Sequence, residues 1–242
     1  MKSVFILWQD KSHSGRMWHP VAKLIQSELG IYSLTYTQGA KNPRFQPFPL
    51  MTDKTKIYHS NELFAFLKNR IPPASRPEHE ELFSWCNLDT ASNYLDLLSV
   101  SGGEKVTDNY RVISLPEKKD NQYINSFFVS GIRYLSDEHK KIVENFPAKH
   151  QLEYEFENDN VNDSQAVLLL DKDQDLRIGY YPKYLTGDLR KLHDLAAKSI
   201  RIEIVRVNKT APEQFKLLCK TISDWPLGFN PCDDLQFYEY KD

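Results

Sequence analysis

The spacing of hydrophobic residues changes partway along this chain. Up to about residue 120, short strand-like runs alternate with stretches whose apolar residues recur at helical spacing. Beyond that point apolar and polar residues alternate in several short segments, most clearly over residues 151–157, QLEYEFE. Such alternation predicts a strand with one buried face and one wet face. We therefore predict an α+β fold made of two parts.

The first part, residues 1–120, is predicted to be a small mixed α/β module whose elements are separated by Gly, Pro and Asn. Strand-like runs cover residues 3–8, 16–30, 31–37 and 110–115, and helices are predicted over 60–71, 76–88 and 91–103. A charged turn at residues 116–122 places the boundary between the two parts.

The second part, residues 121–210, is predicted to be a small antiparallel barrel. Strands are predicted over residues 124–135, 150–157, 165–171, 176–182 and 200–208, and helices over 136–146 and 187–198. The remaining residues, 211–242, are predicted to form a helix over 211–226, with Pro212 in its first turn, and an aromatic tail that packs back on the body.

A run of acids and amides stands between two of these strands. It contains Glu157, Asn158, Asp159, Asn160, Asn162 and Asp163. Asn and Asp are good turn formers, so the run is either a solvated turn or a turn that presents its side chains to a ligand.

Composition narrows the classes of partner. The chain has 242 residues, a net charge of −2 and no stretch of the roughly 20 apolar residues that a membrane helix needs. Its apolar start lacks a cleavage site of small residues, and its three cysteines are scattered, so we expect a cytoplasmic protein without a membrane partner. A protein that follows a long phosphate backbone is usually basic, so any nucleic acid would bind at a small local site.

Motifs for catalysis are missing. There is no Gly-rich phosphate loop, GxSxG, HExxH or paired CxxC, so we expect no enzymatic activity and no cofactor. Glu157, Asp159 and Asp163 offer oxygen ligands, but their spacing lacks the pattern of a calcium loop. We expect no metal there and keep a metal-dependent nuclease as a third alternative.

Residue types that suit a nucleotide converge in the second part. They are Arg133, Tyr134, Asn160, Asp163, Tyr180, Tyr181 and Lys183. Aromatic rings stack on bases at about 1–3 kcal/mol each, cations bind phosphate, and a carboxylate accepts a hydrogen bond from a hydroxyl. The alternative is that the tyrosines belong to an amphipathic core. Arg16 and Trp18 form a secondary candidate cluster, which is also explained by a turn at a strand edge.

Three motifs in order resemble the HIRAN domain, found at the front of SNF2-type repair helicases and as small bacterial proteins. They are GIRYLS at 131–136, ENDNVNDSQAVLLL at 157–170 and IGYYPKYLTGDL at 178–189, within a match over residues 126–207. The resemblance implies an OB-like β-barrel that captures the 3′ end of single-stranded DNA.

The resemblance also assigns roles. It implies that Arg133 and Tyr134 contact the terminal nucleotide, that Asp163 accepts the 3′-hydroxyl, and that Tyr180 and Lys183 lie along the phosphates. Two positions depart from the helicase form. Asn162 replaces a base-stacking tyrosine, and Tyr180 replaces a histidine, which predicts weaker or altered end binding.

Residues 21–40, 47–50 and 58–71 resemble in outline the N-terminal subdomain of HipA-type toxin kinases, through Phe64, Leu67 and Arg70. No kinase segment follows, so a docking or regulatory module is implied. The leading prediction is non-catalytic recognition of single-stranded DNA, at its 3′ end, in bacterial repair or defence. The alternative is a protein-interaction or toxin-regulating module in which residues 1–120 dock a partner.

Overall fold

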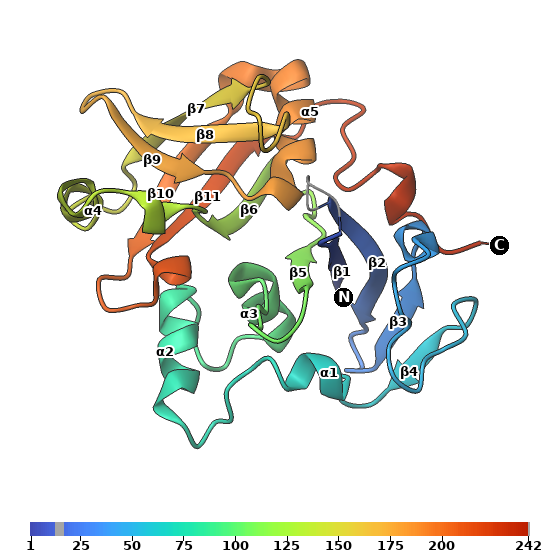
Figure 1. Ribbon diagram of the computed structural model, residues 1–242. Helices are drawn as coiled ribbons and strands as arrows, with labels where there is room; N and C mark the ends of the chain where they lie inside the picture. The colour runs from blue at the N-terminus through green and yellow to red at the C-terminus, as the bar shows by residue number, and fades with distance from the viewer. Residues whose placement is uncertain (13–16, 242) are drawn as a thin grey trace. The chain divides into compact units, whose positions relative to one another are not determined.

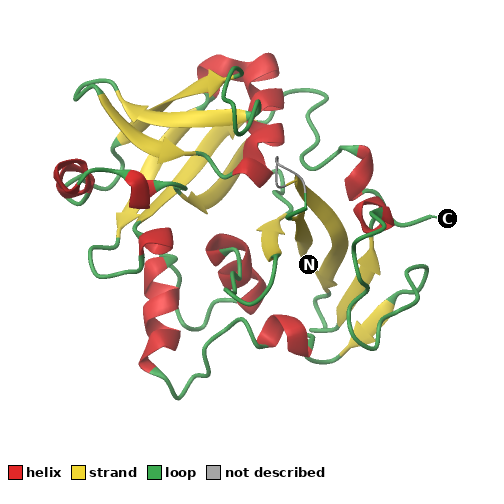
Figure 2. Ribbon diagram, in the orientation of Figure 1, coloured by secondary structure: helices red, strands yellow, loops and turns green. Residues whose placement is uncertain are grey.

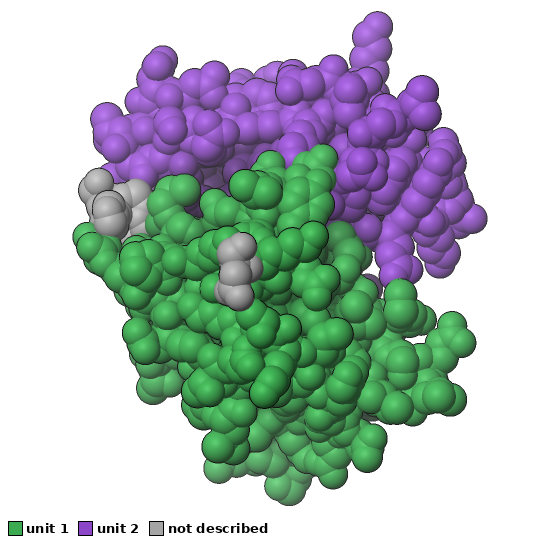
Figure 3. Space-filling view, turned by 90° about the vertical axis from the view of Figure 1, so that its right-hand side faces the viewer, with its two compact units in different colours: residues 1–80, 90–115, 232–242 green, residues 81–89, 116–231 purple. Residues whose placement is uncertain are grey.

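The computed structural model describes residues 1–12 and 17–241, and the chain divides into two compact units, which are coloured separately in Figure 3. The first unit comprises residues 1–80, 90–115 and 232–242, and the second comprises 81–89 and 116–231. Each unit therefore contains segments that are distant in the sequence. The stretch predicted as one C-terminal piece is divided, because its last eleven residues belong to the first unit.

The first unit is built on a five-stranded antiparallel sheet with the order β4-β3-β2-β1-β5 (Figure 1). Its strands are β1 (Lys2–Asp10), β2 (Met17–Gln26), β3 (Tyr32–Tyr36), β4 (Tyr58–Ser60) and β5 (Tyr110–Ser114). Its helices are α1 (Ala65–Lys68) and α3 (Tyr94–Ser101), with 3₁₀ turns η1 (Gln38–Lys41) and η6 (Leu235–Phe237). Helix α2 (Pro77–Trp85) contains the boundary between Glu80 and Glu81.

The core of the first unit lies on one face of this sheet. Ile6, Leu24 and Leu34 are fully buried on neighbouring strands and belong to one cluster. Phe48 stacks on Phe66 with ring centroids 4.3 Å apart. These contacts tie the proline-rich segment and α1 to the sheet, and α1 is shorter than the predicted helix over 60–71.

The C-terminal tail pairs with the end of β3. The Gln38 amide donates to the Tyr238 carbonyl at 2.8 Å, and the Tyr240 amide donates to the Tyr36 carbonyl at 2.9 Å. The Phe237 ring meets Phe5 edge-on at 4.8 Å. The tail therefore adds an extended segment to the first unit.

The second unit is a six-stranded antiparallel sheet with the order β6-β11-β10-β7-β8-β9, whose strands are labelled in Figure 1 and drawn in yellow in Figure 2. Its strands are β6 (Gln122–Phe128), β7 (Gln151–Glu157), β8 (Ala166–Asp171), β9 (Leu176–Tyr180), β10 (Arg201–Val207) and β11 (Leu217–Asp224). Its helices are α4 (Asp137–Val143) and α5 (Thr186–Ala196), with 3₁₀ turns η2 (Ile132–Tyr134), η3 (Lys183–Leu185), η4 (Ala197–Ser199) and η5 (Glu213–Phe215).

The first and last strands of this sheet meet at one point. Ser130, just beyond β6, and Tyr180, at the end of β9, exchange two backbone hydrogen bonds of 2.8 Å. Among the described residues this bridge is isolated, and no continuous β6–β9 ladder closes the sheet into a barrel. The coarse prediction of an antiparallel second part is confirmed.

The predicted C-terminal helix is wrong. Residues 217–224 form β11, which lies between β6 and β10. Pro212, placed for the first turn of a helix, suggested that a helix follows. Almost every residue of β11 is instead buried, because it lies between two strands and its successive residues are covered on both faces of the sheet. Central position in a sheet outweighs a local helix-start signal.

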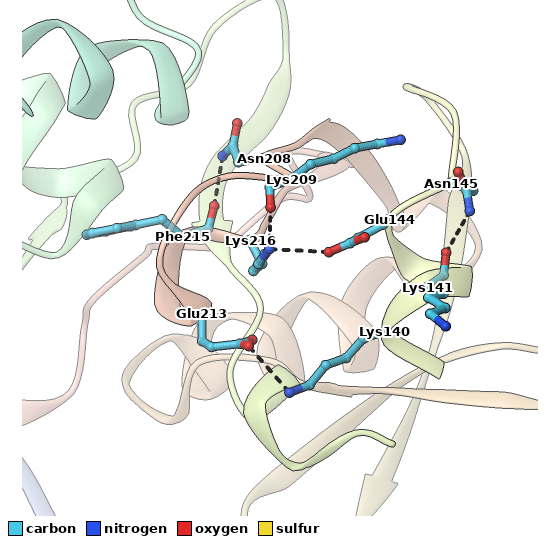
Figure 4. Close-up of polar contacts among 9 residues, drawn as sticks. All are labelled: Lys140, Lys141, Glu144, Asn145, Asn208, Lys209, Glu213, Phe215 and Lys216. Atoms are coloured by element: carbon cyan, nitrogen blue, oxygen red, sulfur yellow. Dashed lines mark hydrogen bonds and ion pairs between the residues drawn. The ribbon is translucent and has the colours of Figure 1, made fainter. Parts of the chain in front are cut away.

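Polar contacts attach α4 to the connection between β10 and β11 (Figure 4). Lys140 pairs with Glu213 at 3.3 Å, and Lys216 pairs with Glu144 at 3.3 Å. The side chain of Asn208 donates to the Phe215 carbonyl at 2.8 Å, which closes the connection on itself. These contacts hold α4, the helix that follows the loop from β6, against the connection between β10 and β11.

Candidate functional site

The loop after β6 presents Arg133 and Tyr134 to solvent. Gly131 has a φ of 86°, a backbone conformation that favours glycine, and Ile132 is buried and anchors the turn. The Arg133 guanidinium lies 4.6 Å from the Tyr134 ring centroid, and its Nη2 donates to the Tyr134 hydroxyl at 2.6 Å. Tyr134 is 77% exposed. A large aromatic face is therefore available on this loop.

Gly179 sets the position of Tyr180. A Cβ added at Gly179 would lie 2.5 Å from the Ser130 carbonyl oxygen and 2.8 Å from the Val129 side chain. Only glycine allows the two backbone segments to approach this closely and form the bridge between Ser130 and Tyr180. The Ile-Gly pair of the sequence motif thus has a steric reason.

The rings of Tyr134 and Tyr180 both lie close to Gly131. A Cβ at Gly131 would be 3.6 Å from Cδ2 of Tyr180 and 4.0 Å from Cδ2 of Tyr134. The two rings are thus neighbours, although 45 residues separate them in the sequence. A side chain at Gly131 would stand between them.

The acid-and-amide run forms a turn built by its own side chains. Asn160 Oδ1 accepts hydrogen bonds from the amides of Asn162 at 3.0 Å and Asp163 at 3.2 Å. Asp163 Oδ1 in turn accepts from the amide of Gln165 at 3.0 Å. Asn and Asp stabilise turns in this way, so the solvated-turn interpretation accounts for part of the sequence.

Glu157 connects this turn to β9. Its Oε2 accepts from Asn160 Nδ2 at 2.8 Å and from the Tyr180 hydroxyl at 3.0 Å, and its Oε1 pairs with Arg177. Burial alone would raise the pKa of Glu157. The hydrogen bonds from Asn160 and Tyr180, with the charge of Arg177, outweigh burial and lower this pKa. Burial, followed by the bond to Glu157, raises the pKa of the Tyr180 hydroxyl.

Asp163 pairs with Lys183, whose Nζ lies 3.3 Å from Oδ1. Both side chains are partly exposed, at 20% for Asp163 and 28% for Lys183. No group in the described part of the chain donates to Asp163 Oδ2. This oxygen can accept a hydrogen bond from a ligand.

All six primary candidate residues belong to one run of contacts on the second unit. The Tyr134 amide donates to the Gly131 carbonyl, and the adjoining Ser130 is bridged by backbone hydrogen bonds to Tyr180 on β9. Glu157 joins β9 to the turn. In order, the run passes through Arg133, Tyr134, Gly131, Tyr180, Glu157, Asn160, Asp163 and Lys183.

An open pocket of ≈ 520 Å³ lies at the turn end of this run. Its lining residues are Phe156, Glu157, Asn158, Asp159, Asn160, Val161, Asn162, Arg177 and Tyr180. Apart from Phe156 and Val161 these are hydrogen-bonding side chains. The pocket therefore suits a polar planar ligand better than an apolar one.

The secondary candidates are placed differently. Asn162 is exposed and lines the pocket. Tyr181 is buried, and its hydroxyl is 2.9 Å from Thr221 Oγ1, so it is a core residue and cannot contact a ligand at the surface. Trp18 lies on β2 in the first unit, with Arg111 6.0 Å from its ring. Arg16 is outside the described residues.

Two basic residues of this region went unnoticed in the sequence. Arg177 is 64% exposed and lines the pocket, and Arg190 on α5 lies 4.3 Å from the Phe156 ring. The polar position of Arg177 between buried Leu176 and Ile178 was a signal that it faces solvent. Its partner Glu157 could not be found without the pairing of β7, β8 and β9.

Metal binding gains no structural support. Within the described residues there is no group of three or more His, Cys, Asp or Glu side chains placed to hold an ion. Glu157, one of the three acidic residues considered for a metal, is instead engaged by Asn160, Tyr180 and Arg177.

Comparisons with known proteins assign no family. No family model matches the chain, and no curated protein matches it. One solved structure, of a protein from Lactobacillus plantarum, aligns with 42% of this chain and 98% of its own, at 16% identity and a TM-score of 0.31. Similarity at that level does not establish a shared fold. No helix in residues 1–12 and 17–241 is long and apolar enough to cross a bilayer.

Proposed function

We propose that the second unit recognises the 3′ end of single-stranded DNA and catalyses no reaction on it. The observation that carries this proposal is the run of contacts from Arg133 to Lys183. It gathers two tyrosine rings, cations at both ends and a carboxylate oxygen open to a donor. These are the groups needed to stack bases, bind phosphates and accept a terminal hydroxyl.

Each residue then has a task. Tyr134 stacks on the terminal base and Arg133, already beside its ring, contacts the phosphate. Lys183 binds the next phosphate, and Asp163 Oδ2 accepts the 3′-hydroxyl. Tyr180, held between Gly131 and Glu157, supplies the second aromatic face.

An OB-like HIRAN fold for residues 126–207 is part of this proposal, and the sheet that supports it extends beyond that range, because β6 begins at residue 122 and β11 spans residues 217–224. The six strands of this sheet are antiparallel, and its first and last strands meet at the Ser130–Tyr180 bridge. The motif glycines Gly131 and Gly179 stand at that junction. Asn162, in place of a tyrosine, removes one stacking ring, so this chain would bind DNA less tightly than the helicase form.

Two phosphate contacts set the expected salt dependence. For single strands, log Kd changes with log salt concentration by about 0.7 for each phosphate neutralised, so Arg133 and Lys183 predict a slope of about 1.4. A slope near 4 would indicate tracking of a longer backbone and would contradict end recognition.

The test compares a linear oligonucleotide with a circular one of the same sequence. Competition against a fluorescent linear strand should show that the circle, which has no end, binds at least about tenfold more weakly. Tyr134→Ala should weaken binding of the linear strand by a similar factor, because stacking on one ring contributes about 1–3 kcal/mol. Tyr238→Ala, which removes a half-exposed tyrosine of the first unit, is the matched control. Equal binding of circle and line would refute the proposal.

A second candidate function is protein docking by the first unit. Its specific support is the tail, because the end of β3 binds an extended segment through Gln38 and Tyr36. A partner segment could add to the same edge by backbone pairing. A peptide of residues 234–242, titrated against the Tyr240→Ala chain, tests this idea. Absence of binding at millimolar peptide would count against it.

A further inference from the structure

The pocket beside the turn carries opposite charges next to each other. Glu157 and Arg177 both line it and form an ion pair with each other. Glu157 is 23% exposed and Arg177 is 64% exposed, so both groups can be reached by a ligand. The pocket thus offers acceptors and donors at one place.

Both groups have unused hydrogen-bonding capacity. A carboxylate accepts about four hydrogen bonds, and three donors contact Glu157, which leaves about one site. Arg177 carries five N–H groups; within the described residues Glu157 accepts from one and the Tyr180 hydroxyl also lies within hydrogen-bonding reach of the guanidinium, which leaves about three. A ligand can therefore bind Arg177 through two acceptors and Glu157 through one donor.

Guanine meets this requirement most fully. Its O6 and N7 are the paired acceptors that arginine binds in a bidentate manner, and its N1 and N2 carry donors for a carboxylate. Adenine offers N7 without a second acceptor beside it. Cytosine also offers two acceptors, O2 and N3, beside its N4 donor, but its single ring would stack over less of Tyr180 and Phe156, the two aromatic residues of the lining.

We propose that this pocket binds a guanine base, with Arg177 reading its O6/N7 edge and Glu157 reading its N1/N2 edge. The proposal rests on the proposed function in one respect, namely that the guanine belongs to one of the last two nucleotides of the bound strand. Tyr180 connects the two sites, because it lines the pocket and is bridged by backbone hydrogen bonds to Ser130, at the start of the loop that carries Tyr134. A strand whose end stacks on Tyr134 would place a neighbouring base in the pocket.

Selectivity is tested with four linear strands of thymidines that carry G, A, C or T at each of the last two positions. Fluorescence anisotropy should show the G strand binding about tenfold more tightly than the T strand, since a good bidentate pair gives about 5- to 150-fold discrimination. Arg177→Ala should abolish this preference, so that the G and T strands bind with equal affinity. Arg177→Lys, which keeps the charge without the paired donors, should also lose most of it.

The matched control is Lys172→Ala. Lys172 pairs with Glu153 at 2.9 Å in an exposed ion pair of the same sheet, and neither residue lines the pocket. This variant should keep the G preference. Equal binding of the four strands, tighter binding of the A strand, or an equal loss of all four in Arg177→Ala would overturn the inference and leave end recognition standing.

A second measurement tests base binding in the pocket independently of strand binding. Titration of dGMP against ¹⁵N-labelled protein should shift the amide resonances of Val161 and Asn162, and dTMP at equal concentration should not. If no strand binds but dGMP gives shifts that Arg177→Ala removes, end recognition is wrong and the guanine pocket is right. If dGMP and dTMP give the same response, the guanine pocket is wrong whatever the strands do.

Discussion

Gly179→Ala is the substitution whose effect follows most directly from the coordinates. The added Cβ would lie 2.5 Å from the Ser130 carbonyl oxygen and 2.8 Å from the Val129 side chain, so the backbone at the bridge must move apart. That movement weakens two hydrogen bonds between Ser130 and Tyr180, worth about 0.5–1.5 kcal/mol each. Strain from overpacking adds about 1–3 kcal/mol. We expect the free energy of unfolding of the second unit to fall by about 3 kcal/mol.

Urea unfolding measures this loss, and hydrogen exchange of the Ser130 and Tyr180 amides localises it. Gly228→Ala is the control, because Gly228 also has a positive φ, of 81°, but no atom lies within 4 Å of its added Cβ. It should cost only the backbone strain of about 1–2 kcal/mol. Equal losses in the two variants, with the Ser130 and Tyr180 amides still protected, would refute the steric explanation of the Ile-Gly motif.

Two other predictions concern the second unit. The folded protein lowers the pKa of Glu157 below its ordinary value of 4.5, so its stabilising effect is present at neutral pH and disappears as the pH falls through the lowered value. In urea unfolding, the free energy of unfolding of Glu157→Gln should therefore be about 1–2 kcal/mol lower than that of the wild-type chain at pH 7, and this difference should shrink at low pH. A difference that does not depend on pH would contradict this explanation. Tyr181→Phe removes the buried bond to Thr221 and should cost about 1 kcal/mol in thermal unfolding. It should leave DNA affinity unchanged, whereas a tenfold loss would return Tyr181 to the binding surface.

Local patterns predicted most of the individual elements. The alternation in QLEYEFE predicted β7, and the apolar run after the polar turn predicted the buried strand β8. The segment over residues 217–224 failed for a physical reason. Pro212 before this segment was a local signal for a helix start, and the place of the segment between β6 and β10 depends on strands far away in the sequence.

The candidate site was predictable in its residue types but not in its connections. Asn and Asp at 160 and 163 predicted a turn, and the turn is built by their side chains. Nothing local indicated that Glu157 would reach Tyr180, because that contact depends on the register of β7 against β8 and of β8 against β9. Tyr181 was predicted as a candidate site residue, but the structure buries it. It follows a site residue directly but points to the core.

The central claim is that Asp163 accepts the hydroxyl at a strand's 3′ end. Fluorescence anisotropy with strands ending in 3′-hydroxyl or 3′-phosphate tests it, because a terminal phosphate removes the donor and brings negative charge to the carboxylate. The wild-type chain should prefer the hydroxyl end by about tenfold or more, and Asp163→Asn should remove most of that preference. Asp173→Asn, which neutralises an exposed carboxylate in the turn between β8 and β9, should keep it. Equal binding of the two ends by the wild-type chain, or an unchanged preference in Asp163→Asn, would contradict end capture.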